Sequence, residues 1–204
     1  MFARFHQQYG AGEEVKALSL RECGQPEVQL VTSRLGGRTF GDGVYRVHLP
    51  ADVGRFTDMA TGAFPSFAPR ITCFASDWLG RQFAIDAARN VSGRPEVLML
   101  EPGTGEVLEI PGDIESFHDD VLVAEPDAAL AISFYAKWRS AGGSKPSYEQ
   151  CVGYQRPLYL GGYDEVENLQ LADFEVYWGL SAQLLTKAAG LQIGTPIGKI
   201  SIGD

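Results

Sequence analysis

The residues of this chain best suited to acid–base or metal chemistry are three histidines, His6, His48 and His118. None of them has the HxxxH or HExxH spacing that places two zinc ligands on one helix face. His118 is followed directly by Asp119 and Asp120, the sole local cluster with acid–base or metal potential. A helix-end histidine with solvated acidic neighbours explains this pattern better than a general base does. We therefore expect no metal site, no cofactor and no catalytic residue.

Other catalytic signatures are also missing from the sequence. There is no Gly-x-Ser-x-Gly nucleophile elbow and no Walker loop. The glycines between residues 36 and 43 lack the GxGxxG spacing, and a helix stop followed by a turn accounts for them. Cys23, Cys73 and Cys151 are far apart and odd in number. We expect them to be reduced, buried thiols and not a disulfide framework.

The elements that must position any site follow from the hydrophobic pattern, which predicts a single α+β domain with a mainly antiparallel sheet flanked by helices. Two predicted strands flank Pro102-Gly-Thr-Gly105, which is a strong hairpin signal. Strands are predicted at residues 44–49, 70–74, 81–85, 96–101, 106–110 and 174–178. Helices are predicted over most of 13–35 with a break at 23–26, from the cap Asp113, at 128–140, at 148–154 as a short helix or turn, and at 180–189.

The composition, 45% hydrophobic and 11% aromatic, is that of a globular protein. No apolar run approaches the roughly 20 residues needed to cross a bilayer, and the first residues do not resemble a signal peptide. We expect a cytoplasmic protein without membrane contact. We divide it into an N-terminal helical segment packed on the main domain (1–40), an α+β domain (41–190) and a C-terminal tail (191–204).

Acidic residues are concentrated in the C-terminal half. The 204 residues have a net charge of −9, and the segment from Glu101 to Glu175 contains 15 acidic residues against four basic ones. Such a surface repels phosphate backbones and attracts basic partners, so direct nucleic-acid binding is not expected. The simpler alternative is an acidic face that only keeps the protein soluble.

A series of short motifs resembles one bacterial family. In order, they are Gly43-Val-Tyr-Arg-Val-His48, Asp77-Trp-Leu-Gly-Arg-Gln-Phe83, Thr104-Gly-Glu106, Phe117-His118, Cys151-Val-Gly-Tyr154, Pro157-Leu-Tyr-Leu-Gly-Gly162, Asn168-Leu169 and Asp173-Phe-Glu-Val-Tyr-Trp178. The family is typified by the C-terminal domain of type VI secretion immunity proteins that protect a cell from its own DNase effector. The segment 157–162 is also loosely similar to SUKH-type immunity proteins. The resemblance implies a cytoplasmic protein that binds and blocks the nuclease domain of a cognate toxin, with no catalysis of its own.

The motif residues are expected to act as scaffold, through a turn-capping Asp–Arg pair, glycines in special backbone conformations and an asparagine that ties a loop. These structural residues are Asp77, Trp78, Gly80, Arg81, Gly161, Gly162 and Asn168. A nuclease must present a basic surface to hold DNA, which favours toxin contacts on acidic loops. The candidates are Asp113, Glu115, Asp119, Asp120, Asp164, Glu165 and Glu167.

Two other functions are compatible with the sequence. A cytoplasmic module that binds another protein or a small ligand would have a groove lined by Trp78 and Tyr163. A hydrolase would place His118 with nearby carboxylates in a deep polar pocket.

Overall fold

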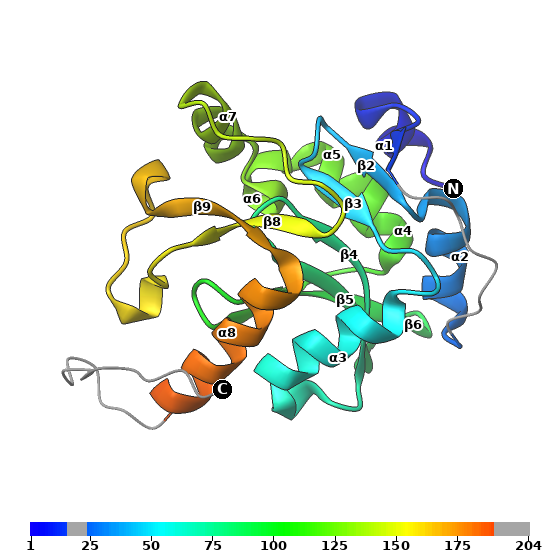
Figure 1. Ribbon diagram of the computed structural model, residues 1–204. Helices are drawn as coiled ribbons and strands as arrows, with labels where there is room; N and C mark the ends of the chain where they lie inside the picture. The colour runs from blue at the N-terminus through cyan, green and yellow to red at the C-terminus, as the bar shows by residue number, and fades with distance from the viewer. Residues whose placement is uncertain (16–23, 190–204) are drawn as a thin grey trace.

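A seven-stranded antiparallel sheet is the centre of the computed structural model, which describes residues 1–15 and 24–189 (Figure 1). Its strands lie in space in the order in which they follow one another in the chain. This confirms the predicted α+β fold with an antiparallel sheet. The strands are β1 (Glu13–Glu14), β2 (Arg38–Phe40), β3 (Tyr45–Val47), β4 (Ile71–Asp77), β5 (Gln82–Val91), β6 (Arg94–Glu101) and β7 (Glu106–Ile110).

Both faces of this sheet are buried, because successive residues of its central strands enter two different cores. Phe83 and Ile85 of β5 pack into one core, whereas Ala84 between them packs into the other. The predicted hairpin is confirmed, with β6 and β7 paired from Val97↔Ile110 to Glu101↔Glu106. Gly105 takes a φ of 73° in its turn.

Helices cover both faces of the sheet (Figure 1). One core receives residues from α8 and most of the buried residues of α3, and the other receives Val53 of α3 and residues from the remaining helices. The helices are α1 (Ala3–Tyr9), α2 (Pro26–Leu35), α3 (Val53–Ala63), α4 (Ile114–Ser116), α5 (Leu122–Ala124), α6 (Pro126–Leu130), α7 (Ile132–Ser140) and α8 (Phe174–Ala188). Short helical turns are η1 (Pro65–Phe67), η2 (Phe117–Val121), η3 (Leu158–Leu160) and η4 (Val166–Asn168).

A second, two-stranded sheet pairs β8 (Gln150–Tyr154) with β9 (Leu169–Asp173) in antiparallel register. The predicted short helix or turn at 148–154 is therefore wrong. The predicted strand at 174–178 is wrong as well, because Asp173 caps a helix there by accepting a hydrogen bond from the Val176 amide. Phe174 and Trp178 are four residues apart, so they share the buried face of α8.

The helix predicted at 128–140 is interrupted at Ala131, which has a left-handed φ of 49° and separates α6 from α7. At the N-terminus, α2 confirms the second predicted helix, while residues 13–14 form strand β1. The first 40 residues thus contribute two strands to the main sheet as well as helices. Residues 16–23 with Cys23, and the tail 191–204, lie outside the described residues.

No helix in the part of the chain that the structure describes is both long and apolar enough to cross a membrane. Cys73 and Cys151 are buried free thiols, as predicted.

Candidate functional site

The turn from Asp77 to Arg81 lies between β4 and β5 of the main sheet. Its residues form hydrogen bonds to elements of the C-terminal half. The Asp77 carboxylate accepts hydrogen bonds from the Arg81 backbone amide at 3.0 Å and from its guanidinium Nε at 2.6 Å. Burial raises the pKa of the Asp77 carboxyl, against the opposing effect of Arg81. The side chains of Trp78 and Arg81 then donate to the carbonyls of Leu130 and Ala129 in α6. Asp77 and Arg81 thus form a buried ion pair beside Trp78, which is 0% exposed.

The same turn also holds β8 and α8. The Val152 amide donates to the Trp78 carbonyl at 2.7 Å, and the Trp178 indole donates to the Gly80 carbonyl at 2.8 Å. Gly80 has a φ of 77°, and a Cβ there would lie 2.9 Å from the Cys151 sulfur. Only glycine fits here, because the backbone is left-handed and because a side chain would collide with Cys151. One turn thus fixes α6, β8 and α8 relative to the main sheet.

A groove of about 440 Å³ opens between helices α6 and α7 and the loop that precedes β9. Among the described residues that line it, acidic side chains outnumber basic ones, and Lys137 is the single cation. We call it the acidic groove. It is lined by Asp127, Ala131, Ser133, Phe134, Lys137, Asp164, Glu165, Val166 and Glu167.

The loop that forms one wall, residues 163–167, is the acidic loop, and Asn168 fixes its conformation. The Asn168 amide oxygen accepts from the Arg156 amide, and its nitrogen donates to the carbonyls of Arg156 and Tyr163. A Cβ on Gly162 would lie 2.0 Å from the Arg156 carbonyl oxygen, so a side chain is excluded there. Asn168 therefore connects the start of the acidic loop with the segment at Arg156.

The acidic loop borders a second cavity of about 220 Å³, which shares Glu165 and Glu167 with the acidic groove and also includes Arg156. Tyr163 lies at this cavity and is 75% exposed. Exposed tyrosines that present a large, rigid surface are common at protein interfaces. The loop therefore combines an aromatic contact with two carboxylates between adjoining cavities.

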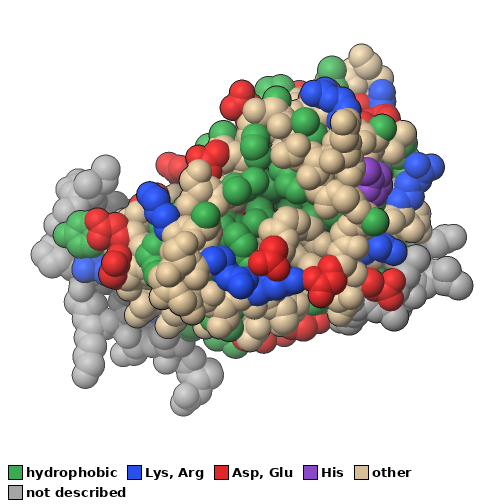
Figure 2. Space-filling model, turned by 90° about the horizontal axis from the view of Figure 1, so that it is seen from above, with side chains coloured by type: hydrophobic (Ala, Val, Ile, Leu, Met, Phe, Trp, Pro, Cys, Tyr) green, Lys and Arg blue, Asp and Glu red, His purple; other side chains and the backbone are tan. Residues whose placement is uncertain are grey.

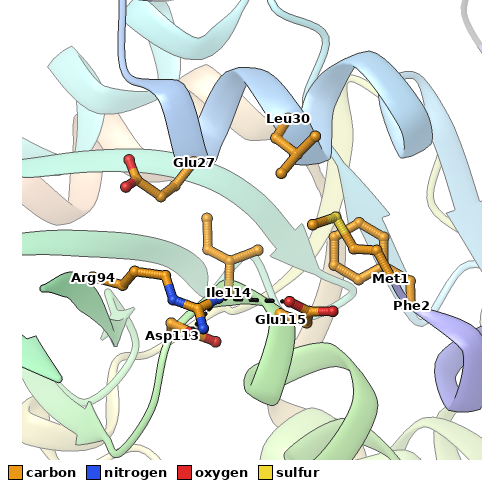
Figure 3. Close-up of a pocket in the computed structure, with 8 residues that line it drawn as sticks. All are labelled: Met1, Phe2, Glu27, Leu30, Arg94, Asp113, Ile114 and Glu115. Atoms are coloured by element: carbon orange, nitrogen blue, oxygen red, sulfur yellow. Dashed lines mark ion pairs between the residues drawn. The ribbon is translucent and has the colours of Figure 1, made fainter. Parts of the chain in front are cut away.

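The other predicted toxin-binding residues lie in two separate places. Asp113 and Glu115 both pair with Arg94, at 2.8 and 3.5 Å, beside a small apolar pocket of about 70 Å³ (Figure 3). Asp113 is only 8% exposed and caps α4 by accepting from the Ser116 amide. The carboxylate of Asp113 is therefore already bound to groups of the same chain.

Asp119 and Asp120 hold the N-terminal helix. Asp119 accepts from the backbone amides of Ala3 and Phe5, and Asp120 forms an ion pair with Arg4 at 2.5 Å. Acidic side chains near the first turn of a helix are stabilising because they satisfy its free amides. Both residues therefore have a structural partner inside the molecule.

Glu165 and Glu167 differ from these residues. Neither side-chain carboxylate forms a hydrogen bond or ion pair with any group in residues 1–15 or 24–189, and both are exposed. Asp164 is intermediate, since it accepts a hydrogen bond from the Tyr154 hydroxyl at 2.6 Å. Among the seven predicted candidates, the two carboxylates without a partner in the described residues both lie on the acidic loop.

The pairing of the basic residues in the C-terminal half also leaves Glu165 and Glu167 without a counter-charge among the described residues. On the face shown in Figure 2, basic and acidic side chains lie next to one another around a hydrophobic centre. Lys145 pairs with Glu13 and Asp42, and Arg139 also pairs with Asp42. Two of the four cations between residues 101 and 175 therefore neutralise acids from the N-terminal half, which leaves the acidic loop with an excess of negative charge.

Asp127 was not among the residues predicted for this site. It lies across the acidic groove from the loop, where it accepts a hydrogen bond from the Ser133 amide that lowers its pKa. The excess of acids over bases in this half is the only feature of the sequence that points to Asp127. Its position beside residues 164–167 depends on tertiary packing.

His118 is a core residue in η2, between α4 and α5, and does not lie at a helix end as predicted. Its side chain is 0% exposed and lines none of the three cavities described above. Nδ1 donates to the Ile114 carbonyl at 2.7 Å, which leaves Nε2 to accept from the Tyr45 hydroxyl at 2.9 Å. The ring packs against Phe2 and Phe5. Burial lowers the pKa of His118 to about 4.

We expect His118 to make folding stability depend on pH in mildly acidic solution. The unfolded chain binds a proton near pH 6.5, whereas the folded protein keeps His118 neutral down to its pKa of about 4. The stability present above pH 6.5 is therefore lost as the pH falls toward 4, by about 1.4 kcal/mol per unit. Urea unfolding across this range should show the slope in the native protein and a reduced slope in His118→Gln. Equal slopes in the two proteins would contradict the assignment.

Comparison with known proteins agrees with the expected family. Residues 113–185 match the family model described as "T6SS immunity protein Tdi1, C-terminal", in which T6SS stands for type VI secretion system. The match confirms the resemblance to type VI secretion immunity proteins and supports an immunity role. The matched segment contains both walls of the acidic groove.

The fold has a counterpart among solved structures. The crystal structure of Atu4351 from Agrobacterium tumefaciens superposes with a TM-score of 0.60, over 90% of this chain and 89% of that chain, at 14% sequence identity. At this identity the similarity concerns the fold alone. No curated protein sequence matches the chain significantly.

Proposed function

We propose that this protein is a cytoplasmic immunity protein that binds a cognate nuclease toxin and neutralises it by direct contact. The observation that carries the proposal is the pair of exposed carboxylates, Glu165 and Glu167, without partners in the described part of the chain and beside an acidic groove. These residues lie inside the segment that matches the immunity family.

Charge complementarity supports a nuclease as the partner. An enzyme that cleaves DNA must hold phosphates with basic groups, and an acidic surface is attractive to those same groups. The backbone of the acidic loop is already fixed by Asn168, so it loses little conformational entropy when an unpaired carboxylate on it binds an arginine or lysine. Binding at the acidic loop would place the inhibitor against the surface that the toxin needs for DNA.

The two alternative functions have less support. Trp78 is 0% exposed, so it cannot line a ligand groove together with Tyr163. His118 is buried among aromatic rings and donates to a backbone carbonyl, which gives it no access to a substrate. We therefore propose action by binding, without a cofactor and without catalysis, in a protein that does not itself hold nucleic acid.

The proposal is tested with the product of the gene adjacent to the one that encodes this chain. Co-expression in a naive host should rescue cells from killing by that protein. Purified together, the two proteins should form a complex that weakens as salt is raised, because exposed charges are screened over about 10 Å at 0.1 M salt. The absence of both rescue and binding would refute the immunity function.

A further inference from the structure

Strand β9 has one edge that no other strand of the described chain covers. Two hydrogen bonds at the ends of the β8–β9 ladder establish which residues face β8. The Gln155 amide donates to the Asn168 carbonyl, and the Phe174 amide donates to the Glu149 carbonyl. Because backbone groups alternate in direction along a strand, Leu171 directs its N–H and C=O away from β8.

Leu171 stands at the centre of this free edge. Neither of its backbone groups has a partner among residues 1–15 and 24–189. On either side of it, the Leu169 carbonyl accepts from the Gln155 side chain, and Asp173 caps α8. The Leu171 side chain is 36% exposed and Val176, in the first turn of α8, is 57% exposed. Exposed apolar side chains therefore lie on β9 and on the first turn of the helix that follows it.

The two outer edges of the main sheet are protected against pairing. The edge strand β1 has only two residues, and both are glutamates. The opposite edge strand, β7, carries Glu106 and Glu109. Short length and charge are the usual protections of edge strands. Strand β9 has neither a proline nor a lysine, and its only charged residue is the helix cap Asp173.

We propose that an extended, basic segment of the toxin adds to the free edge of β9 as a third strand of this sheet. The inference rests on the proposed function and specifies how the partner binds. Main-chain hydrogen bonds to Leu171 supply the pairing, and the carboxylates of the acidic loop just before β9 select lysine or arginine in the incoming segment. Lys137 and Arg156, which line the adjoining cavities, leave the acidic residues in excess.

Hydrogen exchange on the full chain, with and without the inactivated product of the adjacent gene, measures this pairing directly. The Leu171 amide should exchange fast in the free protein and be protected at least about tenfold in the complex. The amides of Gln170 and Ala172, which face β8, should be protected in both states. Protection of Leu171 that grows with protein concentration in the absence of toxin would instead indicate pairing between two copies, and would overturn the proposal.

A pair of substitutions separates the backbone from the side chain. Leu171→Pro removes the outward N–H without removing a hydrogen bond of the folded protein, since prolines are tolerated at such edge positions. It should weaken toxin binding roughly 10–100-fold, whereas Leu171→Thr, which keeps the N–H, should change it less than about threefold. Unfolding midpoints of both variants check that the fold is retained.

The outcomes distinguish this inference from the proposed function. Binding that depends on Glu165 and Glu167 but leaves the Leu171 amide unprotected would overturn strand addition and leave the immunity function in place. No binding by the native protein would refute both. Protection of Leu171, together with selective loss of binding in Leu171→Pro, would support strand addition.

Discussion

Replacing Asp77 by alanine is expected to lower the free energy of unfolding by about 3–5 kcal/mol, the cost typical of removing one partner from a buried ion pair. Asp77 is 0% exposed and its carboxylate accepts two hydrogen bonds from Arg81. The variant would leave the guanidinium of Arg81, which is 6% exposed, without its counter-charge. Such a loss is a large part of the 5–15 kcal/mol that stabilises an ordinary domain. Urea unfolding followed by circular dichroism measures it.

Asp58→Ala is the matched control, because Asp58 is an exposed acid on α3 with no ion pair among the described residues. Its change in unfolding free energy should stay within about 0.5 kcal/mol. A loss below about 1 kcal/mol for Asp77→Ala would show that the Asp77–Arg81 turn does not hold the C-terminal half in place.

The double substitution Glu165→Lys and Glu167→Lys is expected to weaken toxin binding roughly 100-fold with little change in stability. Each exposed ion pair is worth about 0.2–1 kcal/mol, and reversal adds a repulsion of similar size. Stability should be preserved because neither carboxylate has a partner in the described parts of the chain. Titration calorimetry at about 0.1 M salt gives the affinity, and thermal unfolding checks the fold.

The matched control reverses two acids elsewhere, with Glu27→Lys on α2 and Asp58→Lys on α3. Neither Glu27 nor Asp58 lines either of the two cavities beside the acidic loop, and the net charge changes by the same amount. The control should bind within about threefold of the native protein at this salt concentration. Equal losses in both double variants would mean that overall charge, and not the acidic loop, determines binding.

Elements specified by neighbouring residues were predicted correctly from the sequence. The hairpin at 102–105 and the cap at Asp113 each depend on a few adjacent residues, and both were found. The strand β8 was missed because its partner β9 is separated from it by the whole of residues 155–168. The aromatic and β-branched residues at 174–178 favour a strand locally, but the cap at Asp173 and burial of one helical face decide otherwise.

The candidate site was predictable only in part, for the same reason. The acidic residues could be recognised by type, and Asn168 by its capacity to tie a loop. Some of these carboxylates form ion pairs with Arg94 or Arg4, or accept hydrogen bonds from amides of α1. These contacts join segments that are far apart in the sequence, so the sequence does not reveal them. Only the folded structure separates Glu165 and Glu167 from the other candidates.

The turn at Asp77–Arg81 has a consequence for the rates of toxin binding. It holds α6, in one wall of the acidic groove, through the Trp78 and Arg81 side chains, and it holds β8 through the Trp78 carbonyl. Because the acidic loop leads directly into β9, which pairs with β8, we expect the groove to be largely preformed before a partner binds. For such preformed surfaces, lost contacts appear mainly as faster dissociation, while added salt slows association.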